Sequence, residues 1–193
     1  MSAIELPSPF DKLPSASRKF RKLAEGQTLF TQADATQGLY YLVDGIIDLT
    51  RVSDAGHSIM IHRARAGSTF AEASLFSDSY HCTAIGFCES TVISCSKAAI
   101  MQLLNTDIEF ARSMAMQFAI QIQESRRRVE LLSIRSADER VLTAFKDGLL
   151  LDDIKTFAES IGLASETVYR TLAQLTKDER IIKTSRGQYR LNS

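Results

Sequence analysis

Four polar side chains near the C-terminus have the types and spacing needed to recognise the edges of nucleic-acid bases. Ser165, Glu166, Tyr169 and Arg170 would share the polar face of one helix. An arginine can donate two hydrogen bonds to a guanine, and a glutamate can accept one from the amine of a cytosine. This face therefore predicts base-specific contact with double-stranded DNA, in which Glu166 and Arg170 read the bases.

The elements that must position this face are two short helices separated by a tight turn, over residues 152–174. Gly162 stands where the first helix must end, because glycine enters the left-handed conformation without steric cost. Ser165 is predicted to be the N-cap of the second helix. The pattern predicts a helix-turn-helix. Its buried residues are predicted to be Ile154, Phe157, Ala158 and Ile161 in the first helix and Val168, Leu172 and Leu175 in the second.

A second DNA-contacting element is predicted downstream. Residues 180–191 have the pattern of two strands around a turn at Arg186-Gly187, a wing. From Ser165 onward there are six cations and three anions, a local net charge of +3 in a chain that is neutral overall. This excess fits a surface that faces phosphates. Thr167 on the helix, and Lys183 and Arg186 on the wing, complete the predicted DNA-binding residues. A helical pair that packs without touching DNA is the alternative.

Composition narrows the class of protein. The chain has 193 residues, of which 45% are hydrophobic and 24% are charged, enough for one or two domains. Because the basic character is local, a general nucleic-acid coat protein is disfavoured. Three cysteines, an odd and sparse set, do not make a disulfide framework and favour a reducing cytoplasm. No apolar run approaches about 18 residues and no signal-peptide core is visible, so we expect a cytoplasmic protein without a membrane partner.

A long helix is predicted from Asp107 to about Ser133. Its apolar positions alternate spacings of three and four, the pattern of a heptad seam that requires a partner helix. A parallel homodimer is the economical arrangement, and an intrachain helix buried on the preceding domain is the alternative. Met114 and Leu131 lie off the seam and are expected to pack back onto that domain. The predicted dimer interface is Ile108, Ala111, Ala115, Phe118, Ile122, Val129 and Leu132, with Ser125 also on the seam.

The N-terminal half is predicted to be all-β apart from a short basic helix over Ser17 to Leu23. Asp44-Gly45 and residues 53–56 are interpreted as hairpin turns between short strands. Many short, regularly spaced strands favour an antiparallel β-barrel or jelly roll over an open sheet. The fold class is therefore α+β, with three predicted domains: 1–106, the β-barrel; 107–135, the dimerisation helix; and 136–193, a winged helix-turn-helix. The predicted strands cover 39–43, 46–52, 58–63, 82–85 and 91–95.

These elements, in this order, resemble the family of the cyclic-AMP receptor protein and the fumarate-nitrate reduction regulator (Crp/Fnr). The resemblance covers nearly the whole chain. Its motifs are residues 26–30 and 39–45, which look like the opening strands, 67–76, which look like the nucleotide cradle, and 165–170, which look like the recognition helix. The resemblance implies a bacterial transcription regulator that binds a pseudo-palindromic promoter site as a homodimer. RNA polymerase is then a possible partner.

The cradle differs from that of the cyclic-AMP binders. There, a Gly-Glu pair is followed by an Arg and a Ser or Thr that hold the cyclic phosphate and ribose, whereas this chain has Ala71-Glu72 and Cys82-Thr83. Replacing the arginine by Cys82 removes the planar cation that matches a phosphate. We therefore expect the barrel to sense an unknown small-molecule effector other than cyclic AMP, or none. The candidate effector pocket is Ala71, Glu72, Ala73, Cys82 and Thr83.

No cofactor, metal or catalytic residue is predicted. Three cysteines cannot supply four thiolates to an iron-sulfur cluster, and nothing singles out a haem ligand. A metal-dependent barrel enzyme is a rival interpretation, but Glu72, His62 and His81 lack the spacing of a metal site. The other rival is a dimeric ligand-binding module that regulates through protein contacts without DNA.

Overall fold

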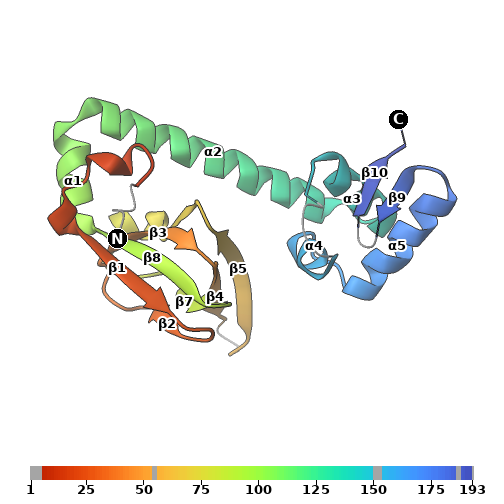
Figure 1. The fold of residues 1–193 in the computed structure, drawn as a ribbon, viewed down its shortest axis with the longest axis horizontal. Coiled ribbons are helices and arrows are strands. Elements are labelled where there is room, and N and C mark those ends of the chain that lie inside the picture. The colour runs from red at the N-terminus through yellow and green to blue at the C-terminus, as the bar shows by residue number, and fades with distance from the viewer. Residues whose placement is uncertain (1–5, 54–55, 150–153, 186–187, 193) are drawn as a thin grey trace. The chain divides into compact units, whose positions relative to one another are not determined.

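The structure, a computed structural model, describes residues 6–53, 56–149, 154–185 and 188–192. The chain forms two compact units, residues 1–115 and 116–193, and the boundary between them falls within helix α2, Ile108–Ser133 (Figure 1). Arg186, predicted to bind DNA, lies outside the described residues. None of the helices in the described ranges combines the length and hydropathy that a bilayer crossing needs.

Two antiparallel four-stranded sheets form the body of the first unit and confirm the jelly-roll-like prediction (Figure 1). One sheet has the strand order β1, β8, β3, β6, and the other has the order β2, β7, β4, β5. Apolar side chains of both sheets meet in one core cluster. The strands are β1 (Arg18–Leu23), β2 (Thr28–Phe30), β3 (Gly38–Asp44), β4 (Ile46–Val52), β5 (Ser58–Arg65), β6 (Thr69–Phe70), β7 (Thr83–Gly86) and β8 (Ser90–Ser96).

The turn at Asp44-Gly45 is not a hairpin. β3 pairs with β6 and β8, whereas β4 pairs with β5 and β7, so this turn carries the chain from one sheet to the other. Gly45 has φ +92°, and a Cβ there would lie 2.2 Å from the Ser90 hydroxyl. That hydroxyl accepts a hydrogen bond from the Ile46 amide at 3.1 Å, close to the point where the sheets separate. Glycine therefore permits a close crossing between sheets, and the hairpin interpretation holds only for the β4–β5 connection.

The predicted helix over Ser17 to Leu23 is also wrong, because residues 18–23 form strand β1. All six residues pair with β8, from Arg18 opposite Cys95 to Leu23 opposite Ser90. The ladder partner comes from more than sixty residues downstream, and the spacing of Phe20 and Leu23 does not reveal it. Tertiary pairing has overridden local preference.

The N-terminal segment packs on the beginning of the long helix. This segment contains two short 3-10 turns, η1 (Phe10–Lys12) and η2 (Ser15–Ser17). The long helix α2 follows directly after the shorter helix α1 (Lys97–Thr106). Phe10 meets Phe110 edge-on at a centroid distance of 6.3 Å, and the Lys12 amine lies 2.7 Å from the Asp107 carboxylate. Hydrogen bonds from Lys12 and from the Phe110 amide lower the pKa of Asp107. Asp107 thereby accepts from an otherwise unpaired amide at the start of α2.

The second unit contains the predicted helix-turn-helix and wing. Its elements are α3 (Ala137–Lys146), α4 (Ile154–Ser160), α5 (Ser165–Lys177), β9 (Ile181–Ser185) and β10 (Gln188–Leu191). They share one apolar core, which Leu131 of α2 joins. The expectation that Leu131 packs on the barrel is therefore wrong, whereas Met114 is buried within the first unit.

Candidate nucleic-acid interface and effector site

The turn before α5 sets the direction of that helix. Gly162 adopts φ +65°, the left-handed conformation predicted for the end of the first helix. Helix α5 begins at Ser165, but its N-cap is Ala164, with φ −69° and ψ 144°, and no side chain caps the helix. Ser165 is thus the first helical residue and not the cap, because the chain becomes helical one residue earlier than predicted. It remains at the N-terminal end of the helix, half-buried.

The buried face of α5 is anchored by polar bonds as well as by apolar packing. Val168, Leu172 and Leu175 are fully buried, as predicted. Thr171, which was not predicted, is also buried, and its hydroxyl donates to the Asp138 carboxylate on α3 at 2.9 Å. A buried hydroxyl needs such a partner, so this bond fixes α5 against α3.

Arg140 holds the turn of the helix-turn-helix. Its Nε donates to the carbonyl oxygen of Ile134 at 2.9 Å, and its Nη1 donates to that of Ile161 at 3.2 Å. One guanidinium therefore ties the end of α4 to the linker that follows α2. The turn that precedes α5 is therefore held by hydrogen bonds within its own domain.

The opposite face of α5 is open to solvent. Glu166 and Arg170 are exposed, and Tyr169 is 57% exposed, whereas Thr167 is half-buried. Within the described part of the chain, no acceptor pairs with the Arg170 guanidinium. An arginine left with all its donors in water fits a residue that binds a partner outside the chain.

The wing lies beside this face. β9 and β10 pair antiparallel, with Lys183 opposite Tyr189, and Lys183 is exposed. Tyr189, which the sequence interpretation missed, packs partly against the C-terminal core. Burial raises the pKa of Tyr189, and the electrostatic interaction with Tyr169 raises it further. The two phenols therefore lie near each other. The clue in the sequence is an aromatic residue between polar Gln188 and cationic Arg190.

The interior of the first unit is filled by aromatic rings. Phe30 stacks on Tyr80 with centroids 3.8 Å apart and on Tyr40 at 5.3 Å, and Tyr40 stacks on Phe70 at 5.3 Å. The Tyr80 hydroxyl accepts from the Gln37 amide at 3.0 Å and lies 3.2 Å from the Tyr40 hydroxyl. Burial and this contact with Tyr80 raise the pKa of Tyr40. These side chains occupy the centre of the barrel as a packed core.

The five predicted effector residues are not equivalent. Cys82 belongs to the core cluster and Ala71, in a left-handed conformation with φ 66°, packs against it. Glu72 is buried and accepts a hydrogen bond from the Thr69 hydroxyl. Thr83 is half-buried and its hydroxyl accepts from the Gln32 amide at 3.0 Å, whereas Ala73 is exposed on the 3-10 turn η3 (Glu72–Phe76). Burial raises the pKa of the Cys82 thiol, with Arg51 opposing the shift.

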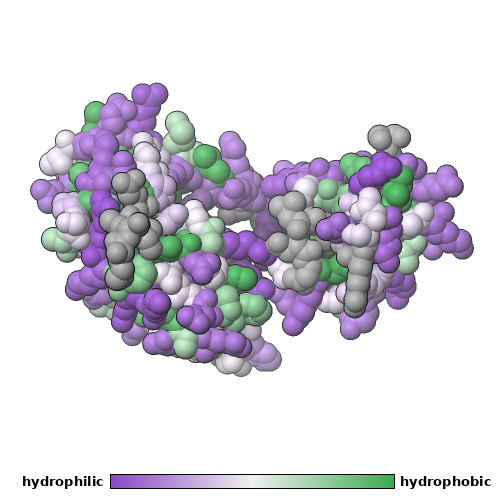
Figure 2. Space-filling model, viewed as in Figure 1, coloured by the Kyte–Doolittle hydropathy of each residue, from purple (hydrophilic) through white to green (hydrophobic). Residues whose placement is uncertain are grey.

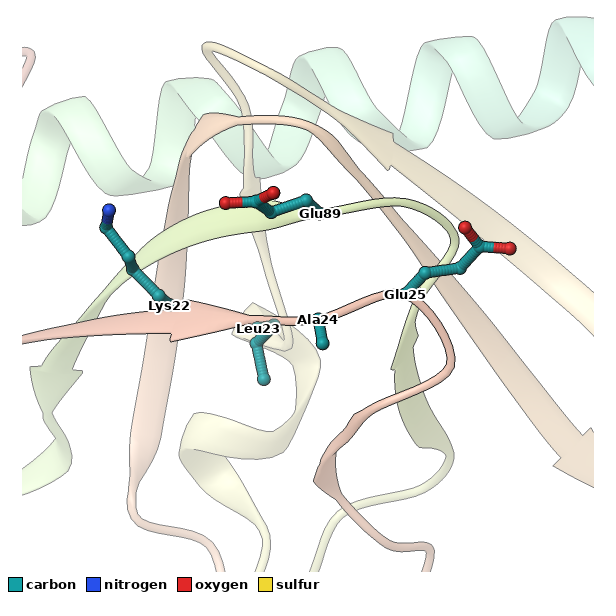
Figure 3. A pocket seen from close by; sticks show the side chains of 5 residues that line it. All are labelled: Lys22, Leu23, Ala24, Glu25 and Glu89. Carbon is teal, nitrogen blue, oxygen red and sulfur yellow. The ribbon is translucent and has the colours of Figure 1, made fainter.

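A surface hollow of the first unit lies elsewhere (Figure 3). It is lined by Lys22, Leu23, Ala24, Glu25 and Glu89, at the end of β1 and the start of β8, and by none of the five predicted effector residues. Lys22, Glu25 and Glu89 are exposed, and in Figure 3 their charged ends point in different directions. This hollow supports no effector role.

The predicted dimer seam on α2 is largely exposed within one chain. Ile108 is 78% exposed, Val129 67%, Ile122 51% and Leu132 42%. Ala115 is also exposed, and Ala111 and Phe118 are half-buried. On the face of the molecule in Figure 2, hydrophilic residues cover most of the surface and apolar residues appear in separate groups. The exposed aliphatic side chains Ile108, Ile122, Val129 and Leu132 therefore lie at heptad spacing along this helix.

Comparison with known proteins agrees with this architecture. Residues 20–107 match the cyclic nucleotide-binding domain family. The chain is 26% identical over 189 residues to the global nitrogen regulator of Synechococcus elongatus. The alignment covers 88% of this chain and 83% of the nitrogen regulator.

Two solved structures share the fold across both units. FixK2 from Bradyrhizobium japonicum has a TM-score of 0.69 at 19% identity and covers 91% of this chain and 93% of its own. A transcriptional regulator of the CRP family from Thermus thermophilus has a TM-score of 0.61 at 18% identity and covers 90% and 92%. The similarity to the global nitrogen regulator supports a DNA-binding transcription regulator. Residues 20–107 match the cyclic nucleotide-binding domain family, and the chain shares its fold with FixK2 and with the CRP-family regulator.

Proposed function

We propose that the protein binds a pseudo-palindromic promoter site as a homodimer, with α5 of each subunit in the major groove. The observation that carries this proposal is the division of α5 into two faces. Val168, Leu172 and Leu175 are buried, whereas Glu166, Tyr169 and Arg170 are exposed on a helix fixed by its own domain. A recognition helix needs this combination of rigid support and free polar groups.

The residues divide by the chemistry of their expected contacts. Arg170 suits a guanine edge and Glu166 suits a cytosine amine, whereas Ser165, Thr167 and Tyr169 suit nearby polar or phosphate groups. Lys183, exposed on β9, suits a phosphate. Arg186 keeps its predicted phosphate role. Since the target is DNA, we place the protein in the cytoplasm and expect no enzymatic activity, with RNA polymerase as a candidate partner.

We further propose that α2 forms the dimer contact, with residues 107–135 as the dimerisation segment between 1–106 and 136–193. The exposure of Ile108, Ile122 and Val129 supports this assignment. Without a partner, these side chains would leave a row of apolar groups in water. Pairing two helices buries the row and also places two DNA-binding domains on one symmetric site.

The barrel is proposed to sense an effector other than cyclic AMP, or to support the dimer without an effector. Cys82 is buried in the core cluster where a phosphate-binding arginine is expected from the resemblance. A neutral buried thiol cannot compensate a phosphate charge.

Selection of binding sites from random double-stranded DNA tests the proposal. The protein is expected to enrich a motif of two inverted half-sites about one helical turn apart. Enrichment of no motif would contradict base reading, and enrichment of a single half-site would contradict binding as a symmetric dimer. The rival interpretation, a ligand-binding module that acts through protein contacts, predicts no retention of DNA at all.

A further inference from the structure

Strand β4 carries an arginine on the side of the sheet that faces the core. Ile47 and Leu49 are buried in the core cluster, and side chains two residues apart share a face of a strand. Arg51 continues this series and is exposed, at the end of β4. The irregularity between β4 and β5 does not change the alternation, because the extra residue, Ile61, is on β5.

The neighbouring strand places Arg51 beside Cys82. β4 pairs with β7 in regular register, from Ile47 opposite Gly86 to Thr50 opposite Thr83. The ladder ends at that pair, and Arg51 and Cys82 are the next residues of the two chain segments at this end, with Cys82 in the core cluster. Arg51 opposes the burial-induced rise in the pKa of the Cys82 thiol, as a nearby cation must. A positive charge therefore stands next to Cys82, supplied by the adjacent strand.

Arg51 differs from Arg63, an arginine of the neighbouring strand β5. Arg63 on β5 is held by Asp48, with Nε 2.6 Å from one carboxylate oxygen and Nη2 2.9 Å from the other. In the described ranges, by contrast, no carboxylate or carbonyl accepts a hydrogen bond from Arg51. Its guanidinium retains the planar pair of donors that matches a carboxylate or a phosphate.

We propose that Arg51 is the anion-binding residue of the barrel and that the effector is a small anion with a carboxylate or phosphate group. This inference rests on the proposed role of the barrel as an effector domain. The anion would bind at the end of the β4–β7 ladder, over Cys82, and the packed aromatic core below would leave it near the surface. A cation on β4 approaches the ligand from a different strand than one at position 82, so the ligand need not have the shape of a cyclic nucleotide.

Nuclear magnetic resonance of the full-length protein tests the assignment. The Nε–Hε signal of Arg51, assigned from its loss in Arg51→Gln, is followed while chloride is exchanged for inorganic phosphate or for acetate at constant ionic strength. The amide signals of Cys82 and Thr83 report the same site in the variant. Arg65→Gln is the matched control, because Arg65 is an exposed arginine at the opposite end of the β4–β5 ladder, opposite Ile46.

The expected result is a saturating shift of the Arg51 signal with at least one of the two anions, and the anion that saturates identifies the chemical class. In Arg51→Gln, the dissociation constant measured at Cys82 and Thr83 should rise at least tenfold, and in Arg65→Gln it should not change. An Arg51 signal that does not move or that moves linearly with both anions would overturn the inference. So would a dissociation constant at Cys82 and Thr83 that is unchanged in Arg51→Gln. DNA binding in chloride is measured separately, so a failure there counts against the proposed function and not against Arg51.

Discussion

The exposed face of α5 and the interior of the barrel make opposite use of polar side chains. On α5, Glu166, Tyr169 and Arg170 stand in solvent above a buried apolar face. In the barrel, the hydroxyls of Tyr40 and Tyr80 lie 3.2 Å apart, and the rings of these two tyrosines stack with those of Phe30 and Phe70. The first arrangement leaves hydrogen-bonding groups available to a partner, whereas the second satisfies them within the chain.

The contrast between the two regions indicates where partners can bind. Donors that remain unpaired on a rigid element suit recognition, because binding then requires no internal bond to be broken. A barrel whose centre is packed with aromatic rings offers a ligand only its margins. We therefore expect the DNA-binding half to tolerate little change on its exposed face, and the barrel to tolerate little change in its interior. Four predictions test this comparison.

The largest effect is expected from a charge in the dimer seam. In Ile122→Glu, dimerisation would bury a carboxylate without a partner, which costs several kcal/mol. The dimer dissociation constant should rise by at least about a hundredfold. Sedimentation equilibrium measures it. Gln123→Glu is the control, since it adds the same charge at the adjacent exposed position. A wild-type protein that is monomeric at micromolar concentration would contradict the dimer.

The second prediction concerns cyclic AMP. A hydrogen bond to a charged group is worth about 1.5–3 kcal/mol, and each 1.4 kcal/mol or so is tenfold in affinity. Because position 82 lacks an arginine, the affinity for cyclic AMP should be about two orders of magnitude lower than that of a site that has the phosphate-binding arginine. Calorimetry is expected to show no binding at micromolar cyclic AMP. Cys82→Arg should restore part of the binding. Tight binding by the unmodified protein would refute the proposal.

A third prediction separates base reading from phosphate contact. Arg170→Ala should weaken binding to the selected site by about 1–3 kcal/mol and relax the preference at one base pair. Lys183→Ala should weaken binding to specific and unrelated DNA alike. Anisotropy titrations with duplexes substituted at each position measure both effects. Equal losses on every duplex for Arg170→Ala would show that it contacts only the backbone.

The smallest effect is an alkaline loss of barrel stability. Burial raises the pKa of the Cys95 thiol to about 11 from 9.0, so the folded chain keeps its proton after the unfolded chain has lost it. The resulting stabilisation is complete below pH 9 and is lost as the pH rises toward 11. It amounts to about 2 kcal/mol. Denaturant unfolding measures the free energy of unfolding at each pH. Between pH 9 and 11 it should fall less in Cys95→Ala than in the unmodified protein. An equal fall in both proteins would show that the Cys95 thiol is not the cause.

The sequence predicts most of the C-terminal domain because its signals are local. Buried positions in α4 and α5 follow helical spacing, and Gly162 takes the conformation that its place requires. Tyr189 was missed because its position beside Tyr169 depends on how the wing packs against α5. Periodicity describes one element at a time and says nothing of such a pairing.

The barrel was predicted in outline only, because its pairings are non-local. Residues 18–23 become a strand through β8, and Asp44-Gly45 crosses between sheets because its flanking strands have other partners. The candidate effector residues came from resemblance, which could locate Cys82 but not the cation beside it. Arg51 becomes visible only when the register of β4 and β7 is known.

We expect α5 to read DNA and the barrel not to respond to cyclic AMP. An anisotropy titration of a duplex from the selection, and of a scrambled duplex, each with and without cyclic AMP, tests both expectations. We predict at least about a thousandfold preference for the selected duplex, the low end for specific DNA-binding proteins, and the same affinity in the presence of the nucleotide. Equal affinity for both duplexes, or tighter binding when cyclic AMP is added, would contradict the account.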